Sequence, residues 1–494
     1  MELNTVTLLL LIICLSCVIV FRLSKGVSKL GQLPPGPTPL PFIGNLLNMK
    51  TNNMVKSLNK FSEKYGPVYT IYLGSKPTVV LNDYAAIKEA LIDQGDDFSG
   101  RGDTPMFHRF TQGNGIAFSN GEKWKNLRRF ALLTLRNFGM GKRSIEERIQ
   151  EEAQYLVKEF RNTKMLPFDP TLYLSRAVSN VICSIVFGDR FDYEDEKFCT
   201  LLRLINDNFK VISSLWGTMY NIFPSVMKHL PGPHNRAFAN FEKLRCFVLE
   251  RIKMHLESYD PTCPRDFIDC FLTKMKQEEQ NPLTSFHTET LVMTTHNLFF
   301  GGTETVSTTL RYGFLILMKH PEVEVKLHEE IDRVIGRNRS PTINDRSGMP
   351  YTDAVIHEIQ RFADIVPMNL PHAVIRHTQF RGYTLPKGTH IIPVLTSVHF
   401  DPIHYKDPAS FNPQHFLDEN QCFKKNDAFM PFSSGKRICL GESLARMELF
   451  LMFVTILQNF TLKSLIRPAE IDLTASENGL GKVPCPYQFS VIPR

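Results

Sequence analysis

The sequence has no cysteines at the paired spacings that a disulfide framework needs. Its ten cysteines are scattered over 494 residues, and two of them, Cys14 and Cys17, lie within an apolar N-terminal stretch. Small secreted domains held together by disulfides carry cysteines at regular, paired spacings. Their absence excludes that class and predicts that the protein works in a reducing, cytosol-facing environment.

The sequence also lacks a Gly/Ser-rich linker, an internal repeat and a low-complexity run that would divide the chain. Its length exceeds the size at which single hydrophobic cores usually stop growing. Hydrophobic residues make up 43% and charged residues 22%, an ordinary globular composition that can form a large core. We therefore predict one large domain.

A strong excess of charge is absent as well. The formal net charge of +7 is mild for this length, and no nucleic-acid-binding motif accompanies it. We therefore expect no nucleic-acid partner.

One long apolar run is present, at the N-terminus. Residues 3–21 are nineteen largely apolar residues, about the length that a helix needs to cross a bilayer, and Arg22, Lys25 and Lys29 follow them. A cleaved signal peptide would instead carry its charges before the apolar run and small residues at a cleavage site. The pattern predicts a transmembrane signal anchor at residues 1–21 with a lumenal N-terminus and a cytoplasmic body.

The next segment, residues 22–40, is basic and rich in proline. Its motif Leu33-Pro34-Pro35-Gly36-Pro37 favours extended, semi-rigid backbone. We interpret the segment as a stiff hinge between the anchor and a body that spans residues 41–494.

The body is predicted to be mainly α with a small β portion. Short β-like runs lie at Val68–Leu73 and 78–81, and later at 391–395 and 487–492. Helical patterns dominate elsewhere and include a helix pair within 200–260. A longer pattern, Thr288–Lys319, would extend roughly 45 Å at 1.5 Å per residue, enough to cross the whole molecule.

A cysteine near the C-terminus has an unusual setting. Cys439 lies between Gly435 and Gly441, directly before a helical apolar pattern formed by Leu440, Leu444, Met447, Leu451 and Val454. The pattern predicts that Cys439 lies at a helix N-terminus, where the helix dipole and Arg437 favour a negative charge. A thiol in this position is expected to ionise easily.

Such a thiolate can be a nucleophile, a redox sensor or a metal ligand, and a buried structural cysteine is a further alternative. No second Cys or His lies two to five residues away, which argues against a zinc or iron–sulfur site. The flanking glycines would let a large flat ligand approach the backbone closely, and Phe432 could pack against that ligand.

Residues 432–441 resemble the haem-binding loop F-x-x-G-x-R-x-C-x-G of the cytochrome P450 superfamily, with every fixed position filled. The rest of the chain is similar to the vertebrate microsomal, drug- and xenobiotic-metabolising type, the second family. The resemblance implies the cytochrome P450 fold and a haem-thiolate catalytic domain over residues 41–494. It also implies haem b as cofactor, with Cys439 as the axial ligand of the iron and Arg437 among the cofactor-binding residues.

A pair of glycines interrupts the long helical pattern at Gly301-Gly302-Thr303-Glu304-Thr305. Glycines inside a helix are costly unless something must approach the backbone or the helix must open, and a simple kink is the alternative. The run resembles the oxygen-activation motif of the superfamily, which implies that Thr305 and Glu304 deliver protons. Gly301 stands where alanine is more common, so we expect a wider pocket there, lined also by Phe118 and Phe300.

Other positions acquire roles through the same resemblance. Trp124 and Arg128 lie four residues apart on one predicted helix face, which by itself is more typical of a solvated basic surface. The resemblance implies that these two residues, together with Arg101 and His372, bind the haem propionates. It also implies a buried structural set, listed in chain order as Glu358, Arg361 and His415, in which histidine replaces the usual arginine.

The implied activity is the insertion of one oxygen atom from O2 into lipophilic small molecules, namely xenobiotics, steroids or fatty acids. No G-x-G-x-x-G fingerprint follows a strand in this chain, so NADPH would act indirectly. The expected electron donors are NADPH-cytochrome P450 reductase and cytochrome b5, and the expected location is the endoplasmic reticulum membrane with the catalytic domain on the cytoplasmic face. Basic residues expected at the docking face are Lys123, Lys125, Arg129, Arg136, Lys142, Lys424, Lys425 and Lys436.

Two alternatives from other classes remain at this point. One is a haem-thiolate isomerase that rearranges hydroperoxides, although such enzymes usually lack the pair Glu304 and Thr305. The other is a non-catalytic haem or lipid carrier, which would need neither a proton relay nor a basic docking face.

Overall fold

A computed structural model describes residues 7–10, 12–16, 33–50, 53–138 and 143–494. The predicted anchor and hinge, residues 1–21 and 22–40, lie largely outside these ranges. Within the described ranges, no helix is long and apolar enough to cross a membrane.

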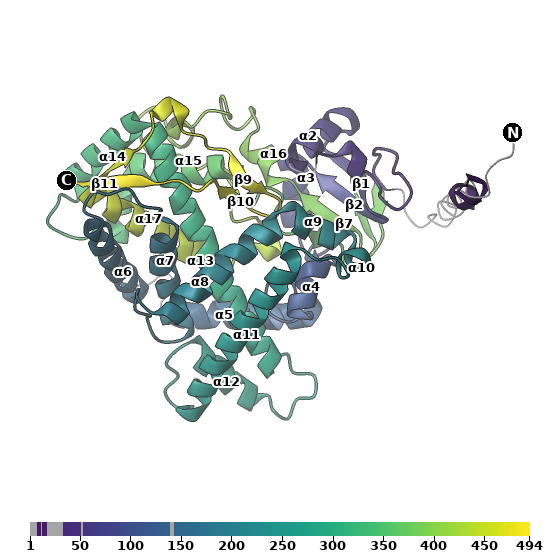
Figure 1. The fold of residues 1–494 in the computed structure, drawn as a ribbon, viewed down its shortest axis with the longest axis horizontal. Coiled ribbons are helices and arrows are strands. Elements are labelled where there is room, and N and C mark those ends of the chain that lie inside the picture. The colour runs from purple at the N-terminus through teal and green to yellow at the C-terminus, as the bar shows by residue number, and fades with distance from the viewer. Residues whose placement is uncertain (1–6, 11, 17–32, 51–52, 139–142) are drawn as a thin grey trace.

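The body is mainly helical, and its small β portion is divided, with β1, β2 and β7 at one end of the long axis and β11 at the other (Figure 1). The first helices are α2 (Met54–Tyr65), α3 (Tyr84–Lys88), α4 (Pro105–Thr111), α5 (Gly121–Asn137), α6 (Arg143–Asn162), α7 (Thr171–Val186) and α8 (Glu196–Ser213). The central ones are α9 (Leu215–Ile222), α10 (Pro224–Met227), α11 (Pro233–Glu257), α12 (Phe267–Gln277) and α13 (Thr288–Lys319). The last are α14 (Pro321–Val334), α15 (Pro350–Ala363), α16 (Leu395–His399) and α17 (Glu442–Asn459).

The strands form one mixed sheet and three hairpin-like pairs. The sheet has the order β1-β2-β7-β4-β3, with bounds Val68–Leu73, Lys76–Leu81, His390–Pro393, His372–Ala373 and Gly100–Arg101. The pairs are β5 (Thr378–Phe380) with β6 (Tyr383–Leu385), β8 (Phe460–Ser464) with β11 (Phe489–Pro493), and β9 (Ala475–Asn478) with β10 (Lys482–Pro484). Within the sheet, Arg101 of β3 pairs with His372 of β4, so two residues that are distant in sequence become neighbours.

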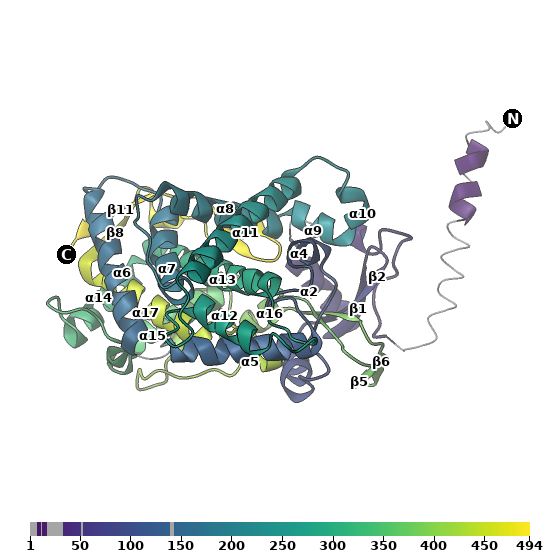
Figure 2. The same cartoon turned by 90° about the horizontal axis from the view of Figure 1, so that it is seen from below.

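Helix α13 is the central element, and its predicted bounds are confirmed. It packs against α7, α11, α15 and α17, and Figure 2 shows α8 and α11 along one side of it. At 1.5 Å per residue its 32 residues extend roughly 48 Å. Most of the residues in its C-terminal half are fully buried, which anchors the helix in the core.

The helix pair that we predicted within 200–260 is present as α8 and α11, with two short helices between them. Pro224 and Pro233 occupy the first turns of α10 and α11, where the missing proline N–H costs nothing. The prolines therefore divide this segment into separate helices, and α8 and α11 run over α13.

The double glycine does not break α13. The helix is continuous through Gly301 and Gly302, so the two glycines do not divide it. A Cβ atom at Gly302 would lie 2.5 Å from Cδ1 of Ile182 on α7, whereas a Cβ atom at Gly301 would meet nothing within 4 Å. Gly302 therefore permits close packing of α13 on α7, and Gly301 faces open space.

Candidate active site

An internal cavity of about 400 Å³ lies between α13 and the loop that carries Cys439. The residues around it come from α4, α5, α7, α8, α11, α13, α17 and several loops. Most of them are apolar, with aromatic rings contributed by Phe107, Phe110, Phe118, Phe209, Phe241 and Phe300. A cavity of this kind suits a large apolar ligand.

Cys439 lines this cavity, but its helix begins later than predicted. Helix α17 starts at Glu442 with Gly441 as its N-cap, so Cys439 lies before the helix and not in its first turn. The Cys439 N–H donates to the Phe432 carbonyl at 2.9 Å, which closes the loop. Cys439 has exposed surface and lines the cavity.

The expectation of an easily ionised thiol is wrong for the protein alone. Burial raises the pKa of Cys439, and this effect outweighs the hydrogen bond from the Gly441 N–H and the positive charge of Arg128, both of which lower it. The physical reason is that a thiolate surrounded by protein loses its hydration. A positive partner within the cavity would favour the thiolate.

Three guanidinium groups line the same cavity, of which those of Arg101 and Arg437 are buried and that of Arg128 is half-buried. Arg101 donates to the carbonyls of Ala117 and Leu370, at 3.1 and 3.2 Å. Arg128 donates to the Ile438 carbonyl at 2.6 Å, and Arg437 donates to backbone carbonyls at 2.7 and 2.8 Å. Among the described residues, none of these three guanidiniums forms an ion pair with a carboxylate.

The electrostatic consequence is visible in their pKa values. Burial and then Arg128 lower the pKa of Arg101 to about 9. Burial, followed by Arg101 and Arg128, lowers the pKa of Arg437 to about 8. Buried positive charges without counter-ions are costly, so this part of the cavity favours an anionic ligand.

Unpartnered donors occur beside these guanidiniums. The indole Nε1 of Trp124 and Nη1 of Arg437 are buried without a hydrogen-bond partner, and the Arg437 guanidinium lies 3.7 Å from the Trp124 ring centroid. The His372 Nδ1–H donates to the Phe98 carbonyl at 2.8 Å, while its Nε2, an acceptor in the neutral ring, is buried and unpartnered. Burial lowers the pKa of His372 well below its ordinary value.

These observations test whether the residues fit haem. Haem carries two anionic propionates on a large apolar ring and needs an axial ligand. The cavity offers apolar walls, buried guanidiniums without counter-ions, unpartnered N–H groups and the Cys439 thiol. Of the predicted propionate ligands, His372 alone does not line the cavity, although it pairs with Arg101 in the sheet. The donor set fits haem.

Thr305 lies on the face of α13 that borders the cavity, and its hydroxyl donates to the Gly301 carbonyl at 2.8 Å. Phe118, Phe300 and Gly301 line the cavity as well. Because the Thr305 proton is used within the helix, its oxygen can accept a hydrogen bond from the cavity side.

Glu304 does not line the cavity. Its side chain is 1% exposed and accepts a hydrogen bond from Asn206 of α8 at 3.3 Å, while its Oε1 is unpartnered. Burial raises the pKa of Glu304 to about 7, against the lowering effect of Arg311. The adjacent residues Glu304 and Thr305 therefore lie in different surroundings.

Glu358, Arg361 and His415 lie together away from the cavity. The Arg361 guanidinium donates twice to the Glu358 carboxylate, both times at 2.7 Å, and both side chains are fully buried. His415 contacts the same carboxylate through Nδ1 at 3.1 Å. Arg361 also donates to the His399 and Pro408 carbonyls, so the group joins α15 to the chain that leads toward the Cys439 loop.

Several cavity residues were not found from the sequence. Asn297 lies one helical spacing before Gly301, and its Oδ1 accepts hydrogen bonds from the N–H groups of Ile116 and Ala117 at 3.0 and 3.2 Å. It thereby holds the loop that carries Phe118. The spacing of four residues from Thr305 through Gly301 was a signal that could have identified it. The aromatic residues of α4 and α11 had no such signal.

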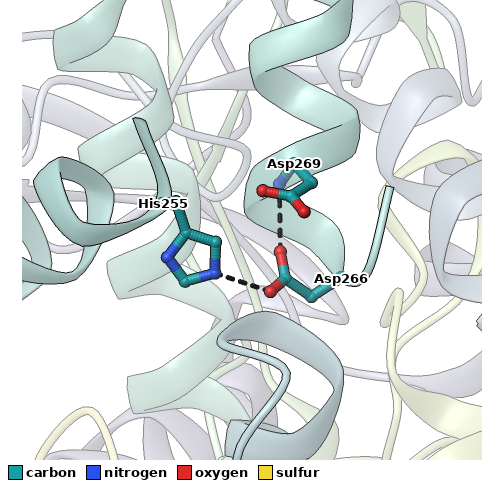
Figure 3. Close-up of side chains that lie close together, drawn as sticks. All are labelled: His255, Asp266 and Asp269. Atoms are coloured by element: carbon teal, nitrogen blue, oxygen red, sulfur yellow. Dashed lines mark hydrogen bonds and ion pairs between the residues drawn. The ribbon is translucent and has the colours of Figure 1, made fainter. Parts of the chain in front are cut away.

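A second buried polar cluster, formed by His255, Asp266 and Asp269, lies outside the cavity (Figure 3). His255 Nε2 contacts Asp266 Oδ2 at 2.6 Å, and Asp266 Oδ1 caps α12 by accepting from the Asp269 N–H at 2.9 Å. Asp269 also pairs with Arg265 at 2.7 Å. Because its polar atoms bond within the protein, we interpret the cluster as a connection between α11 and α12.

Comparison with known proteins agrees with this site. The sequence model of the family described as Cytochrome P450 matches residues 34–491. The chain is 61% identical over 459 residues to Cytochrome P450 2F2 of Mus musculus, which covers 93% of this chain and 94% of the mouse protein. It is 58% identical to Cytochrome P450 2F3 of Capra hircus and 57% identical to Cytochrome P450 2G1 of Oryctolagus cuniculus, each over 494 residues and 100% of both chains. The chain therefore belongs to the cytochrome P450 family, among relatives of its second family, and is a haem-thiolate monooxygenase.

Proposed function

We propose that this monooxygenase inserts one oxygen atom of O2 into uncharged lipophilic molecules, such as xenobiotics, steroids or fatty acids, with electrons supplied by NADPH through a separate reductase. The observation that carries the proposal is the cavity itself. It combines mostly apolar walls with Cys439, Thr305 and three guanidiniums, two of them buried, that have carbonyl but no carboxylate partners within the described structure.

In this proposal Cys439 is the axial ligand of haem iron. Arg101, Arg128, Arg437 and Trp124 hold the propionates, and each of them supplies an N–H donor to an anionic group. His372 is a further proposed propionate ligand; because its Nδ1–H is bonded to the Phe98 carbonyl, it donates from Nε2 when a nearby propionate favours the protonated ring. When bound, haem supplies the redox-active iron at which dioxygen is reduced. The negative propionates would also offset the charges of Arg101 and Arg437 and so reverse the lowering of their pKa values.

Thr305 and Glu304 are proposed to handle protons. Oxygen insertion consumes two electrons and two protons and releases the second oxygen atom as water. The Thr305 oxygen can orient a water molecule in the cavity, because its own proton is bonded to the Gly301 carbonyl. Glu304, with a pKa of about 7, can both gain and lose a proton at neutral pH and lies on the side of α13 that faces α8.

The electron donor is proposed to dock on a basic surface on the thiolate side. Lys125, Arg129, Arg136, Lys424, Lys425 and Lys436 are exposed, and Lys123 is half-buried. Lys142 lies outside the described residues. Exposed positive charges favour association with an acidic partner such as NADPH-cytochrome P450 reductase or cytochrome b5.

Membrane association is proposed to combine the N-terminal anchor with an apolar surface on the body. Phe42 and Leu47 are 69% and 77% exposed, and Val226 of α10 is 58% exposed. Phe42 and the end of α9 approach each other at Gly74, which places exposed apolar residues near the start of the body. We propose the endoplasmic reticulum membrane as the location, with the catalytic domain on its cytoplasmic face.

Reconstitution with the reductase tests the proposal. The haem-loaded protein, the reductase and NADPH are supplied with isotopically labelled O2 and a panel of lipophilic compounds. We expect NADPH-dependent products that contain one labelled oxygen atom. Product formation from hydroperoxides without NADPH would support an isomerase instead, and ligand binding without turnover for every compound would support a carrier.

A further inference from the structure

His296 is an unusual histidine within the cavity. It lies on α13, lines the cavity and is 9% exposed. Both of its ring nitrogens are buried without a hydrogen-bond partner, a state that no other histidine among the described residues shares. Buried polar atoms are normally paired, so two free nitrogens on one ring require an explanation.

The neighbours of His296 cannot supply the missing partners. The ring stacks on Phe300 with centroids 5.8 Å apart and meets the edge of Phe241 with centroids 4.8 Å apart. These rings fix the imidazole on two sides and offer no conventional hydrogen-bond acceptor. The adjacent Asn297 uses its Oδ1 to hold the Ile116 and Ala117 N–H groups. None of these neighbours bonds the His296 nitrogens, and because His296 lines the cavity, a molecule in the cavity is the partner that we consider.

The chemistry of the ring limits what that molecule can be. Burial lowers the pKa of His296 to about 4, so the imidazole is neutral at neutral pH, with one nitrogen that donates and one that accepts. A neutral ring among aromatic side chains does not offset the desolvation of a charged group. A hydroxyl group fits best, because it can accept from or donate to either nitrogen.

We propose that His296 is a specificity-determining residue that binds the hydroxyl group of a lipophilic phenol or alcohol. His296 precedes Thr305 by nine residues, which is about 14 Å along the helix axis. Both residues line the cavity, so a substrate whose hydroxyl group is held at His296 has its apolar part free to reach toward Thr305. This inference rests on the proposed function, since it names the substrate class of the same cavity.

A binding experiment tests the inference without turnover. Dissociation constants of biphenyl and 4-hydroxybiphenyl are measured by calorimetry on the haem-loaded protein, without reductase or NADPH. In His296→Phe and His296→Leu, the preference for the hydroxylated compound relative to biphenyl should fall roughly three- to tenfold, the range of one hydrogen bond. His296→Gln should retain part of the preference because it keeps a donor and an acceptor.

The matched control is His377→Phe, which changes an exposed histidine that does not line the cavity. It should leave the ratio of the two dissociation constants as in the wild type. Equal ratios in the wild type, His296→Phe and His296→Leu would overturn the inference, as would a failure of the wild type to bind either compound. Neither result depends on oxygen insertion, so this outcome is separate from that of the turnover experiment.

Discussion

Gly301 and Gly302 are neighbours in α13, yet they are small for different reasons. Gly301 has no atom within 4 Å of its missing Cβ, whereas Gly302 packs on Ile182. The space beside Gly301 is cavity that a substrate can occupy. The space beside Gly302 is filled by α7.

This difference predicts opposite effects of alanine at the two positions. Gly301→Ala should increase stability by roughly 0.5–1 kcal/mol through helix propensity and narrow the cavity. The ratio of the products that Gly301→Ala forms from a bulky and from a slim substrate should differ from that of the wild type. Gly302→Ala is the matched control and should lower stability by about 1 kcal/mol or more through overpacking. Melting temperatures and product profiles check both variants, and an unchanged product ratio in Gly301→Ala would place this residue away from the substrate.

Cys439 offers a test at the level of one ligand atom. Cys439→His should replace the proposed thiolate ligand by an imidazole nitrogen. The reduced, carbon monoxide-bound protein should then lose the long-wavelength Soret band for which the family is named. The spectrum of the variant is compared with that of the wild type at equal haem content. Retention of the band would contradict the assignment of Cys439.

The proposed role of Thr305 in proton delivery can be tested by measuring whether electrons from NADPH end in product or in hydrogen peroxide. Thr305→Ala removes the hydroxyl oxygen that borders the cavity and should divert reduced oxygen to hydrogen peroxide. The ratio of product to NADPH consumed should fall, while NADPH oxidation itself continues. Thr305→Ser is the control, because it keeps the hydroxyl. If the ratio is the same in the alanine variant and the wild type, Thr305 has no part in proton delivery.

At the scale of elements, buried ion pairs connect segments that are far apart in sequence. Arg361 and Glu358 join α15 to the segment before the Cys439 loop. His255 joins α11 to the capped start of α12. Removing one member of such a group leaves a buried partner unsatisfied, which costs more than the bond itself contributes.

The His255 connection predicts a pH dependence of stability. Burial lowers the pKa of His255, but hydrogen bonds to Asp266 and the Arg251 carbonyl outweigh burial and raise it above its ordinary value of 6.5. When a histidine has a higher pKa in the folded than in the unfolded protein, its protonation stabilises the fold. This contribution is complete at pH values below the unfolded-state pKa and is lost as pH rises through the folded-state pKa. His255→Gln should therefore lower the melting temperature more in mildly acidic than in alkaline buffer. If the melting temperatures of wild type and His255→Gln differed by the same amount at every pH, the His255 connection would not depend on protonation.

At the scale of the whole molecule, we propose that both the N-terminal anchor and the body attach the protein to the membrane. Deletion of residues 1–29 removes the apolar run of residues 3–21. The truncated protein should be released from membranes by high salt, whereas the full chain should require detergent. Sedimentation of membranes after each extraction measures this. Full dependence on detergent after truncation would mean that exposed apolar residues such as Phe42 and Val226 hold the body in the bilayer.

The sequence by itself determined the family, the central helix Thr288–Lys319 and the cysteine loop, because each depends on local spacing. The sequence alone shows the five fixed residues within 432–441 and the helical period over α13, without knowledge of the tertiary structure. Strand β1 was predicted at its exact bounds for the same reason. The start of α17 was placed two residues too early, since the apolar pattern continues from Leu440 into the capping turn.

Tertiary structure decided what each side chain faces. The sequence placed Glu304 and Thr305 together, but only the packing of α8 on α13 puts Glu304 outside the cavity and Thr305 beside it. Burial, which is a property of the assembled fold, raises the pKa of Cys439 against the local effect of its loop. The unpartnered His296 depends on aromatic rings from α11 and α13 that enclose it. Local spacing can be read along the chain, whereas burial and partners arise between segments that the fold alone brings together.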